Sequence, residues 1–536
     1  MSIAYRSCQT ILPLSLGICL AQQAIASLPT APFPLGRPDL EETRSSETLA
    51  PGVTLYRVAR GSADRSSLWV VTAGVARTKT EKTKLLACVR TVGVEPRMEA
   101  YETPGRHPAA YVEVLGGNYP DEALARAAVA RARGCALSTR AIAATPYQST
   151  GPWRLSIVEV DPSVYRGRLF SWAGTGNATR RTTTTEIARS RNALVAINGG
   201  FFAMTAEEGV VGEPAGISVV AGQLRSEATL GRPYLVIRDQ PRVSVQISPS
   251  ARPWPKIKWS DGRITLVNGI NRQPGQVRDC GTTGKSKNRL PSQDETCAVT
   301  DDLVAITEHS GFVPNTAGAV MATLRQDGHL VEGRATSPGG IMLVGIGRMA
   351  RGLRERISSS VTAQLDLSFN DPTGDGDTDL LYAVNGAPLL LWNGKMVRHD
   401  DSEGWATRNA SISRLKYVHN WSVLRNPRTA VGVSADGHIW LVVVDGREFA
   451  ESSSVATRRS VGLSIEELRR VMKHLGARDA INLDGGGSSA MVVRGCLITH
   501  PSDPTGEREI GDAILLVLER ISSDMNRKRI PSRADF

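Results

Sequence analysis

The segment INLDGGGSSAMVV, residues 481–493, places one aspartate, three glycines and two serines between two apolar stretches. Consecutive glycines weaken a regular strand or helix, because glycine loses the most conformational freedom on folding. A flexible linker would have polar flanks, and a P-loop would contain Gly-Lys-Ser/Thr; this segment has neither. The pattern predicts a tight turn after a buried strand, where backbone amides and Asp484 meet a ligand. The alternative is a structural turn in which Asp484 caps backbone amides.

Two further segments bring polar residues to the end of an apolar strand. ALVAINGGFFAM, residues 193–204, leads into Asn198, Gly199 and Gly200, followed by two phenylalanines that either stack on a sugar or pack in the core. IWLVVVDGR, residues 439–447, is apolar up to Asp445 and Arg447, as expected of a buried central strand.

Arg428 lies before the strand that precedes this one. A guanidinium binds phosphate through two parallel hydrogen bonds, which lysine cannot reproduce. Arg428 is therefore a candidate phosphate ligand, and the alternative is an ion pair with a carboxylate.

Taken together, these motifs resemble the phosphodiester glycosidase family. The matching segments agree in order and spacing over about residues 151–520, and they are INGGFF (197–202), VNGIN (267–271), NPRTAVG (426–432), VVVDGR (442–447), NLDGGGSS (482–489) and GER (506–508). The resemblance implies a mixed-sheet domain that hydrolyses the glycosidic bond of a phosphodiester-linked sugar.

We assign site residues on this basis. Asp484 and Asp445 are the expected pair of carboxylates, since glycoside hydrolysis commonly uses two on opposite faces of the sugar. Arg428 is expected to stabilise the charge that develops on the phosphate. The expected substrate-binding residues are Asn198, Gly199, Gly200, Glu213, Asn385, Arg447, Gly485, Gly486, Gly487, Ser488 and Ser489.

Residues 67–145 form a separate unit with the predicted order β-α-β-β-α-β of a ferredoxin-like fold. The strand LWVVTAGV, the strand YVEVLGG and the helix PDEALARAAVARARG resemble the sporulation-related repeat (SPOR) family, which binds peptidoglycan. The fold class is therefore α+β, with a small ferredoxin-like domain before the glycosidase-like domain. An unrelated ferredoxin-like adaptor is the alternative for this unit.

The N-terminus predicts export. Residues 1–26 combine Arg6, a short apolar core and an Ala-Ile-Ala cleavage site, as in a signal peptide. Residues 27–66 are rich in proline, serine and charge and predict a linker, and 521–536 form a basic tail. No segment is long enough to span a membrane. We expect a periplasmic or secreted protein.

Five cysteines remain after cleavage. In an oxidising compartment we expect Cys280 to pair with Cys297 and Cys88 with Cys135, which leaves Cys496 unpaired. No cysteine and histidine spacing predicts zinc. Oxygen ligands for calcium are conceivable in one acidic stretch, at Asp371, Asp375, Asp377 and Asp379, although a solvated turn is the alternative. No cofactor is required.

The net charge of +11 favours an anionic partner, here a cell-envelope glycan rather than nucleic acid. We predict an exported glycosidase that acts on a sugar-1-phosphodiester or a related anionic glycan and is targeted by peptidoglycan binding. Two alternatives are a cell-wall binding protein with an inactive glycosidase-like domain, and a hydrolase or lyase of a non-phosphorylated polysaccharide.

Overall fold

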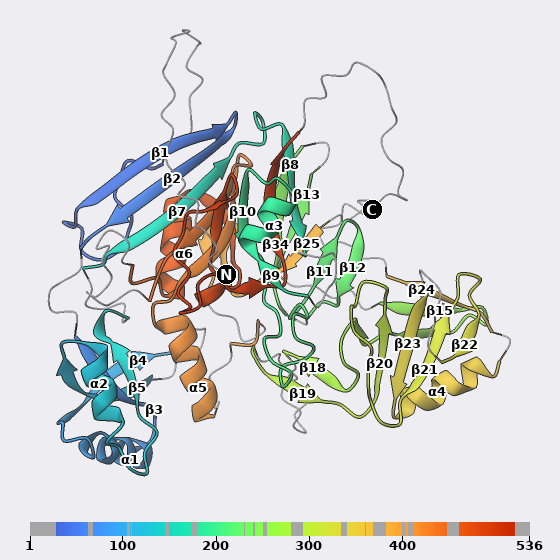
Figure 1. Cartoon of the computed structure of the whole chain (residues 1–536), viewed down its shortest axis with the longest axis horizontal. Coiled ribbons are helices and arrows are strands. Elements are labelled where there is room, and N and C mark those ends of the chain that lie inside the picture. The colour runs from blue at the N-terminus through green and yellow to red at the C-terminus, as the bar shows by residue number, and fades with distance from the viewer. Residues whose placement is uncertain are drawn as a thin grey trace, which may run out of the picture.

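The computed structural model describes residues 28–62, 68–103, 108, 110–144, 150–173, 180–229, 231–239, 242–249, 255–279, 293–333, 340–359, 361–367, 382–398, 403–405, 411–447 and 460–519. The fold is rich in strands, with few helices and several sheets (Figure 1). The predicted signal peptide, the tail and the four candidate calcium ligands lie outside the described residues.

An eight-stranded antiparallel sheet forms the centre of the molecule. Its order is β1 (Glu42–Ala50), β2 (Val53–Arg60), β7 (Trp153–Val160), β29 (Ile439–Val444), β28 (Arg428–Ser434), β30 (Ala477–Asn482), β26 (Leu389–Trp392) and β27 (Lys395–Met396). All six residues of β29 are buried, as the apolar run IWLVVV predicted.

Both faces of this sheet are covered. One face packs on α6 (Ile465–His474), which begins with a capping box of Ser464 and Glu467. The other face packs on two five-stranded sheets. The first has the order β32 (Cys496–Leu497), β31 (Met491–Val493), β10 (Val195–Asn198), β34 (Ala513–Leu518), β8 (Gly167–Trp172). The second has the order β12 (Gln223–Ser226), β11 (Ser218–Val220), β25 (Tyr382–Asn385), β13 (Tyr234–Arg238), β14 (Ser244–Ser248).

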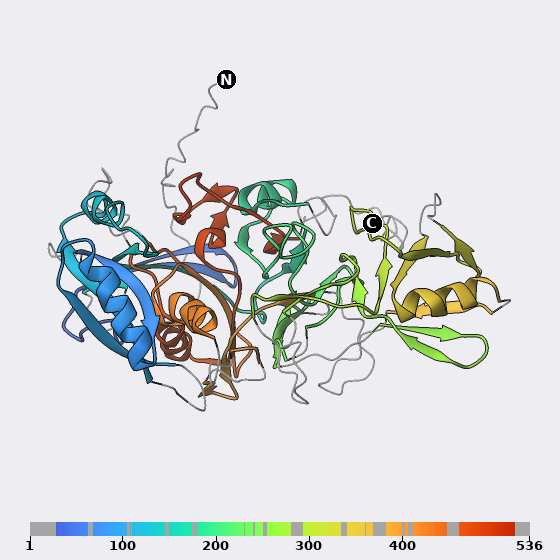
Figure 2. The same ribbon diagram turned by 90° about the horizontal axis from the view of Figure 1, so that it is seen from below.

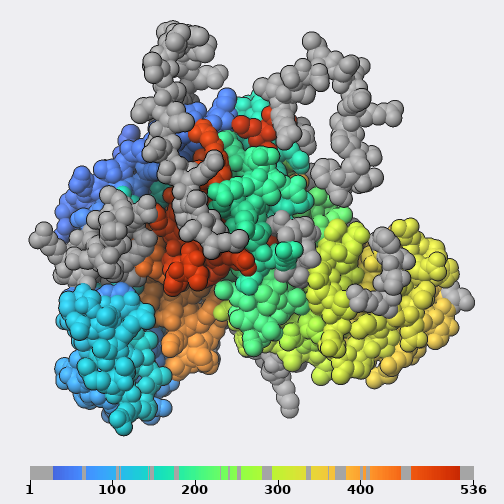
Figure 3. Space-filling model, viewed as in Figure 1, coloured from blue at the N-terminus to red at the C-terminus, as the bar shows by residue number. Residues whose placement is uncertain are grey.

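A separate lobe lies between β14 and β25 along the chain. It contains α4 (Arg348–Ile357) and three sheets. The five-stranded sheet has the order β17 (Gly269–Ile270), β20 (Asp302–Ile306), β23 (Ile341–Ile346), β21 (Val320–Leu324), β22 (Leu330–Glu332). The three-stranded sheet has the order β16 (Ile264–Leu266), β15 (Lys256–Trp259), β24 (Ala363–Asp366), and the two-stranded sheet pairs β18 (Gln276–Arg278) with β19 (Thr296–Ala298). In Figure 3 this lobe (yellow) and the small domain (blue to cyan) occupy opposite ends of the molecule.

The small domain follows β2 and contains β3 (Trp69–Ala76), α1 (Lys79–Arg90), β4 (Pro96–Glu102), β5 (Ala110–Tyr119), α2 (Glu122–Val129) and β6 (Ser138–Ala141). Its sheet has the order β4-β5-β3-β6. The disulfide Cys88–Cys135 closes this domain as expected. Tyr101 and Tyr111, on the sheet, pack with Leu415 of α5 (Ile412–Val418), which lies beside the domain in both ribbon views (Figure 2).

The linker prediction for residues 27–66 is wrong over β1 and β2. The two strands form a hairpin, and β2 pairs along its whole length with β7, from Val53–Val160 to Arg60–Trp153. Proline and charge near this hairpin hid its alternating pattern, in which apolar residues of β2 face the core. The small domain is consequently an insertion between two paired strands.

Two cysteine predictions have different outcomes. Cys297 is disulfide-bonded, while Cys280, its expected partner, lies outside the described residues. Cys496 is also disulfide-bonded, so the expectation that it is left unpaired is wrong. None of the helices in the described ranges is long and apolar enough to cross a bilayer.

Candidate active site

The glycine run connects two layers of the fold. β30 ends at Asn482 in the eight-stranded sheet, and β31 starts at Met491 in the neighbouring sheet. The amide of Asp484 donates to the carbonyl of Gly199 (3.1 Å), just beyond the end of β10. Strand ends from two sheets therefore meet at Asp484, as the shared pattern of the segments predicted.

A cavity of about 240 Å³ opens at this junction. Its walls come from five parts of the chain that are distant in sequence. The lining residues are Phe201, Phe202, Met204, Glu208, Ala215, Arg232, Arg278, Asp279, Gln293, Asp294, Trp405, Tyr417, Trp421, Asn426, Arg428, Arg447, Asp484, Gly485, Gly486, Gly487 and Arg508.

Each glycine of the run has a steric role. Gly486 has a φ of +61°, which L side chains rarely adopt. A Cβ on Gly485 would lie 2.9 Å from the carbonyl oxygen of Pro427, and one on Gly487 would overlap the Asp503 carboxylate. The Gly486 amide donates to the Pro427 carbonyl (3.0 Å), so the turn is fixed against the start of β28. The run is a rigid turn that forms part of the cavity wall.

Asp484 presents its carboxylate to the cavity. Burial raises the pKa of Asp484 to about 6, against the opposing hydrogen bond from the Gly485 amide (2.8 Å). The nearby Asp294 carboxylate also raises this pKa, whereas Arg508 lowers it. A carboxylate with a pKa near neutrality in a cavity is suited to proton transfer.

Two guanidinium groups lie beside this carboxylate. Arg428 is 1% exposed, and its Nε and Nη2 atoms donate to the carbonyls of Leu463 (2.9 Å) and Trp421. Arg447 is more exposed and donates to the Asn426 side chain (2.9 Å). Within the described residues, neither arginine forms an ion pair with a carboxylate, so the alternative reading of Arg428 as an ion-pair partner is wrong there.

These two arginines repel each other electrostatically. Burial and then the charge of Arg447 lower the pKa of Arg428 to about 9. Two adjacent cations that form no ion pair within the described residues can form a site for an anion, because a bound anion relieves their repulsion. Arg447 also has a φ of +64°, a strained backbone conformation for a non-glycine residue.

An aromatic wall stands next to the arginines. Trp421 lies on the π-helix His419–Val423, and its ring stacks on that of Trp405 with centroids 4.5 Å apart. Arg428 lies over the Trp421 ring at 4.8 Å, and Phe201 lies 6.1 Å from it. Aromatic faces of this kind suit the apolar face of a sugar ring. The sequence analysis identified Phe201 but missed both tryptophans, which belong to none of the glycine-rich motifs.

The opposite wall comes from the segment around β18 and β19. Asp294 pairs with Arg278, and Asp279 pairs with Arg232 (2.7 Å). Burial raises the pKa of Asp294. Asp294 thus lines the cavity with Asp484, as do Glu208 and Asp279. It was not predicted because it lies in a polar loop outside any motif.

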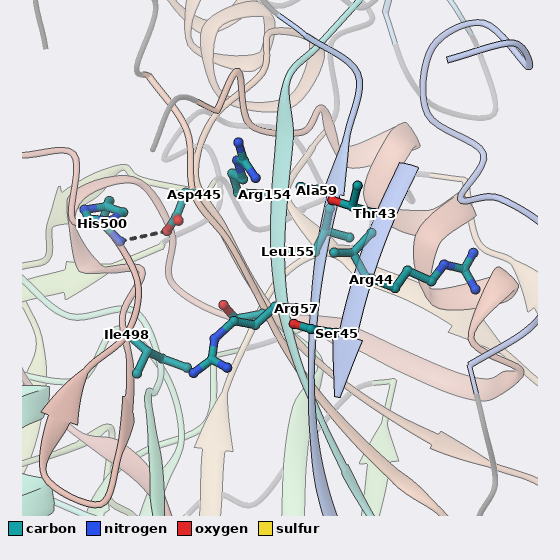
Figure 4. Close-up of a pocket in the computed structure, with 12 residues that line it drawn as sticks. Thr43, Arg44, Ser45, Arg57, Ala59, Arg154, Leu155, Asp445, Ile498 and His500 are labelled. Atoms are coloured by element: carbon teal, nitrogen blue, oxygen red, sulfur yellow. Dashed lines mark hydrogen bonds between the residues drawn. The ribbon is translucent and has the colours of Figure 1, made fainter. Parts of the chain in front are cut away.

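The structure separates Asp445 from Asp484. Asp445 lines a different cavity, of about 390 Å³, between β1, β2, β7 and His500 (Figure 4). Its Oδ1 atom accepts a hydrogen bond from the His500 amide (2.9 Å). Asp445 does not line the cavity of Asp484, so the predicted pair of carboxylates is corrected: Asp484 shares its cavity with Asp294 instead.

Asn198 and Asn385 form hydrogen bonds that position the backbone around the site, and their side chains do not line the cavity. The Asn198 amide donates to the Asp484 carbonyl (2.8 Å), and its oxygen accepts from Thr429 (2.6 Å). Asn385 exchanges hydrogen bonds with the backbone of Phe201 (3.0 and 3.2 Å). Both side chains are buried, and neither lines the cavity, so the expected contact with a sugar is replaced by a positioning role.

The other predicted binding residues divide into two groups. Gly485, Gly486, Gly487 and Arg447 line the cavity, as expected. Gly199, Gly200, Glu213, Ser488 and Ser489 do not. Gly199 and Gly200 pack tightly against Asp512 and Asn385, and Glu213 accepts from the Val210 amide (3.0 Å).

A buried carboxylate behind the site also escaped the sequence analysis. Asp512 accepts a hydrogen bond from the Gly200 amide (2.8 Å), and burial raises its pKa to about 6. Asp512 directly precedes the apolar strand β34, whereas Asp484 follows a strand, and this position at a strand end was the available signal. The described residues contain no cluster of acidic, histidine or cysteine side chains that could hold a metal.

Comparison with known proteins agrees with this geometry. Residues 303–517 match the phosphodiester glycosidase family. The matched range contains Arg428, Arg447, Asp484 and Arg508 but not the INGGFF and VNGIN segments. This match supports a glycosidase-type function for the domain.

Three individual proteins illustrate the similarity. A Burkholderia pseudomallei protein described as exported is 29% identical, has a TM-score of 0.79, and is aligned over 92% of this chain and 99% of its own. The mouse N-acetylglucosamine-1-phosphodiester alpha-N-acetylglucosaminidase is 25% identical over 243 residues, which are 45% of this chain and 41% of that protein. The human enzyme is 25% identical over 42% of this chain and 38% of its own. The chain thus spans about two fifths of the length of these enzymes.

Proposed function

We propose that this protein hydrolyses the glycosidic bond of a sugar-1-phosphodiester. The observation that supports it most strongly is that Arg428 and Arg447, two cations that form no ion pair in the described chain, line one cavity with the Asp484 carboxylate. A neutral polysaccharide would not need this pair. A phosphodiester would place its charge on the arginines and its sugar against Trp421 and Phe201.

The proposed reaction breaks the bond between the anomeric carbon and the phosphate oxygen. Asp484, as a carboxylate, takes a proton from water while the water oxygen bonds to the anomeric carbon. The electron pair of the broken bond stays on the phosphate, which leaves as a phosphate monoester. Arg428, Arg447 and the amides of the glycine turn would stabilise the extra negative charge on that group.

Residues 67–145 are proposed to be a ferredoxin-like, SPOR-like domain that binds a cell-wall glycan in an exported protein. The alternating order of strands and helices supports this proposal, as does the similarity of the chain to a protein described as exported.

The test compares two substrates with the same sugar. An N-acetylglucosamine-1-phosphodiester and a neutral aryl N-acetylglucosaminide are incubated with the purified protein, and free sugar is measured. We expect hydrolysis of the phosphodiester alone. Preference for the neutral glycoside would refute the proposed role of the arginines, and binding to cell walls without hydrolysis of either would favour a non-catalytic binding protein.

A further inference from the structure

A cavity of about 310 Å³, distinct from that of Asp445 and called the second cavity below, lies where the small domain meets the main domain. One side consists of the small-domain sheet, including Trp69, Thr139 and Arg140. The other side consists of Lys416 at the end of α5 and Asn420 on the π-helix. This is the same π-helix that carries Trp421 of the candidate active site.

The two cavities share part of their walls. Asn426 and Arg447 line both of them, and they are joined by hydrogen bonds from the guanidinium to the Asn426 oxygen (2.9 and 3.2 Å). A ligand whose phosphate lies against Arg447 in the first cavity therefore has the second cavity directly on the other side of that residue.

A buried network of ion pairs and hydrogen bonds joins the small domain to the main domain. Glu113 of β5 forms an ion pair with Arg140 (3.0 Å) and lies 3.4 Å from the His419 ring. Tyr111 hydrogen-bonds the other nitrogen of His419 (2.8 Å). A buried network of this kind fixes the position of the sheet against the π-helix, because separating the two would leave charged groups without partners.

The charge of the second cavity is predominantly positive. Four basic side chains line it, Arg140, Lys416, Arg425 and Arg447, against the single acidic Glu113. Glu113 balances Arg140, and Arg425 is paired with Glu467 (2.6 Å) behind the wall. Lys416 is exposed on the surface of the cavity, together with the shared Arg447.

We propose that this second cavity is a subsite for the alcohol side of the substrate, and that this side is an anionic chain carrying further phosphates. The inference rests on the proposed function, because Arg447 places the scissile phosphate between the two cavities. The small domain then acts as one wall of an extended substrate cleft.

The test uses Lys416→Glu, which reverses an exposed charge in the last turn of α5. Lys473→Glu is the matched control, because Lys473 is an exposed lysine in the last turn of α6 and lines neither cavity. The substrates are a methyl ester and an oligo(glycerol phosphate) ester of N-acetylglucosamine-1-phosphate. Lys416→Glu is expected to raise KM about tenfold for the long ester and to leave the methyl ester unchanged. The difference should shrink with added salt.

Equal KM values of wild type and Lys416→Glu for the long ester, or equal effects of both lysine variants, would overturn the subsite. If the wild type cleaves neither ester, the proposed function fails. The subsite is then judged by direct binding of oligo(glycerol phosphate): weaker binding by Lys416→Glu than by Lys473→Glu supports it, and equal binding rejects it.

Discussion

Replacing Asp484 with asparagine should slow turnover strongly and stabilise the protein at the same time. Asparagine keeps the shape of the side chain and the oxygen that accepts from the Gly485 amide. It removes the carboxylate that serves as the proposed base, which is expected to lower kcat by about 10²- to 10⁴-fold.

The gain in stability follows from the pKa. The pKa of Asp484 is raised from 3.8 to about 6 in the folded protein, so the folded state holds this proton more tightly than the unfolded state. Ionisation of Asp484 therefore does not change the free energy of unfolding below pH 3.8 and lowers it progressively between pH 3.8 and pH 6. Above pH 6 the loss is constant at about 3 kcal/mol. Because the Asp484 side chain is still partly exposed to the cavity, we expect Asp484→Asn to raise the free energy of unfolding by about 1–3 kcal/mol above pH 6.

Thermal unfolding at two pH values tests this reasoning. At pH 7.5 the Asp484→Asn variant should unfold about 1–3 °C above the wild type, and at pH 4 the two should be nearly equal. Asp39→Asn is the control, because that carboxylate is 69% exposed and should change neither stability nor activity. Equal melting temperatures at pH 7.5, or a variant that keeps wild-type turnover, would refute the account of Asp484.

Three further outcomes are expected. Arg428→Lys should lower kcat/KM for a sugar-1-phosphodiester by about a hundredfold, since lysine cannot keep the bonds to the Leu463 and Trp421 carbonyls and also donate to a phosphate; an unchanged value would remove Arg428 from the site. In Asp294→Asn the acidic limb of the kcat profile should move below pH 6, because the Asp294 charge raises the pKa of Asp484; a limb that moves up contradicts this coupling. Cys135→Ser should destabilise the small domain by about 4 kcal/mol, given a sequence separation of 47 from Cys88, as measured by limited proteolysis of that domain; unchanged resistance contradicts the prediction.

The sequence predicted elements with strong local patterns. The apolar run IWLVVV forms β29, which is buried along its whole length as predicted. The start of α6 also follows a local pattern, since Ser464 caps it together with Glu467. The steric need for glycine in the run after Asp484 was likewise visible in the sequence. These features depend on residues near one another in the chain.

Pairings between distant residues could not be predicted in this way. Asp445 and Asp484 both follow apolar strands, yet they line different cavities. Asp445 lies with residues of β7, whereas Asp484 lies with the aromatic wall of Trp405 and Trp421. Asn198 has the polarity of a sugar ligand, but its hydrogen-bonding groups are occupied by Asp484 and Thr429. Which side chains remain available to a ligand is decided by contacts between layers, and those contacts leave no periodic pattern in one sequence.

The insertion of the small domain between β2 and β7 restricts how that domain can move. Its two ends leave the central sheet side by side, where Gly61 comes close to the carbonyl of Thr150. A domain joined by a single linker can rotate about it, whereas a domain held at two adjacent points loses most of that rotation. The entropy of orienting the small domain against the main domain is therefore lost once, when the chain folds, and not again whenever a ligand binds between them.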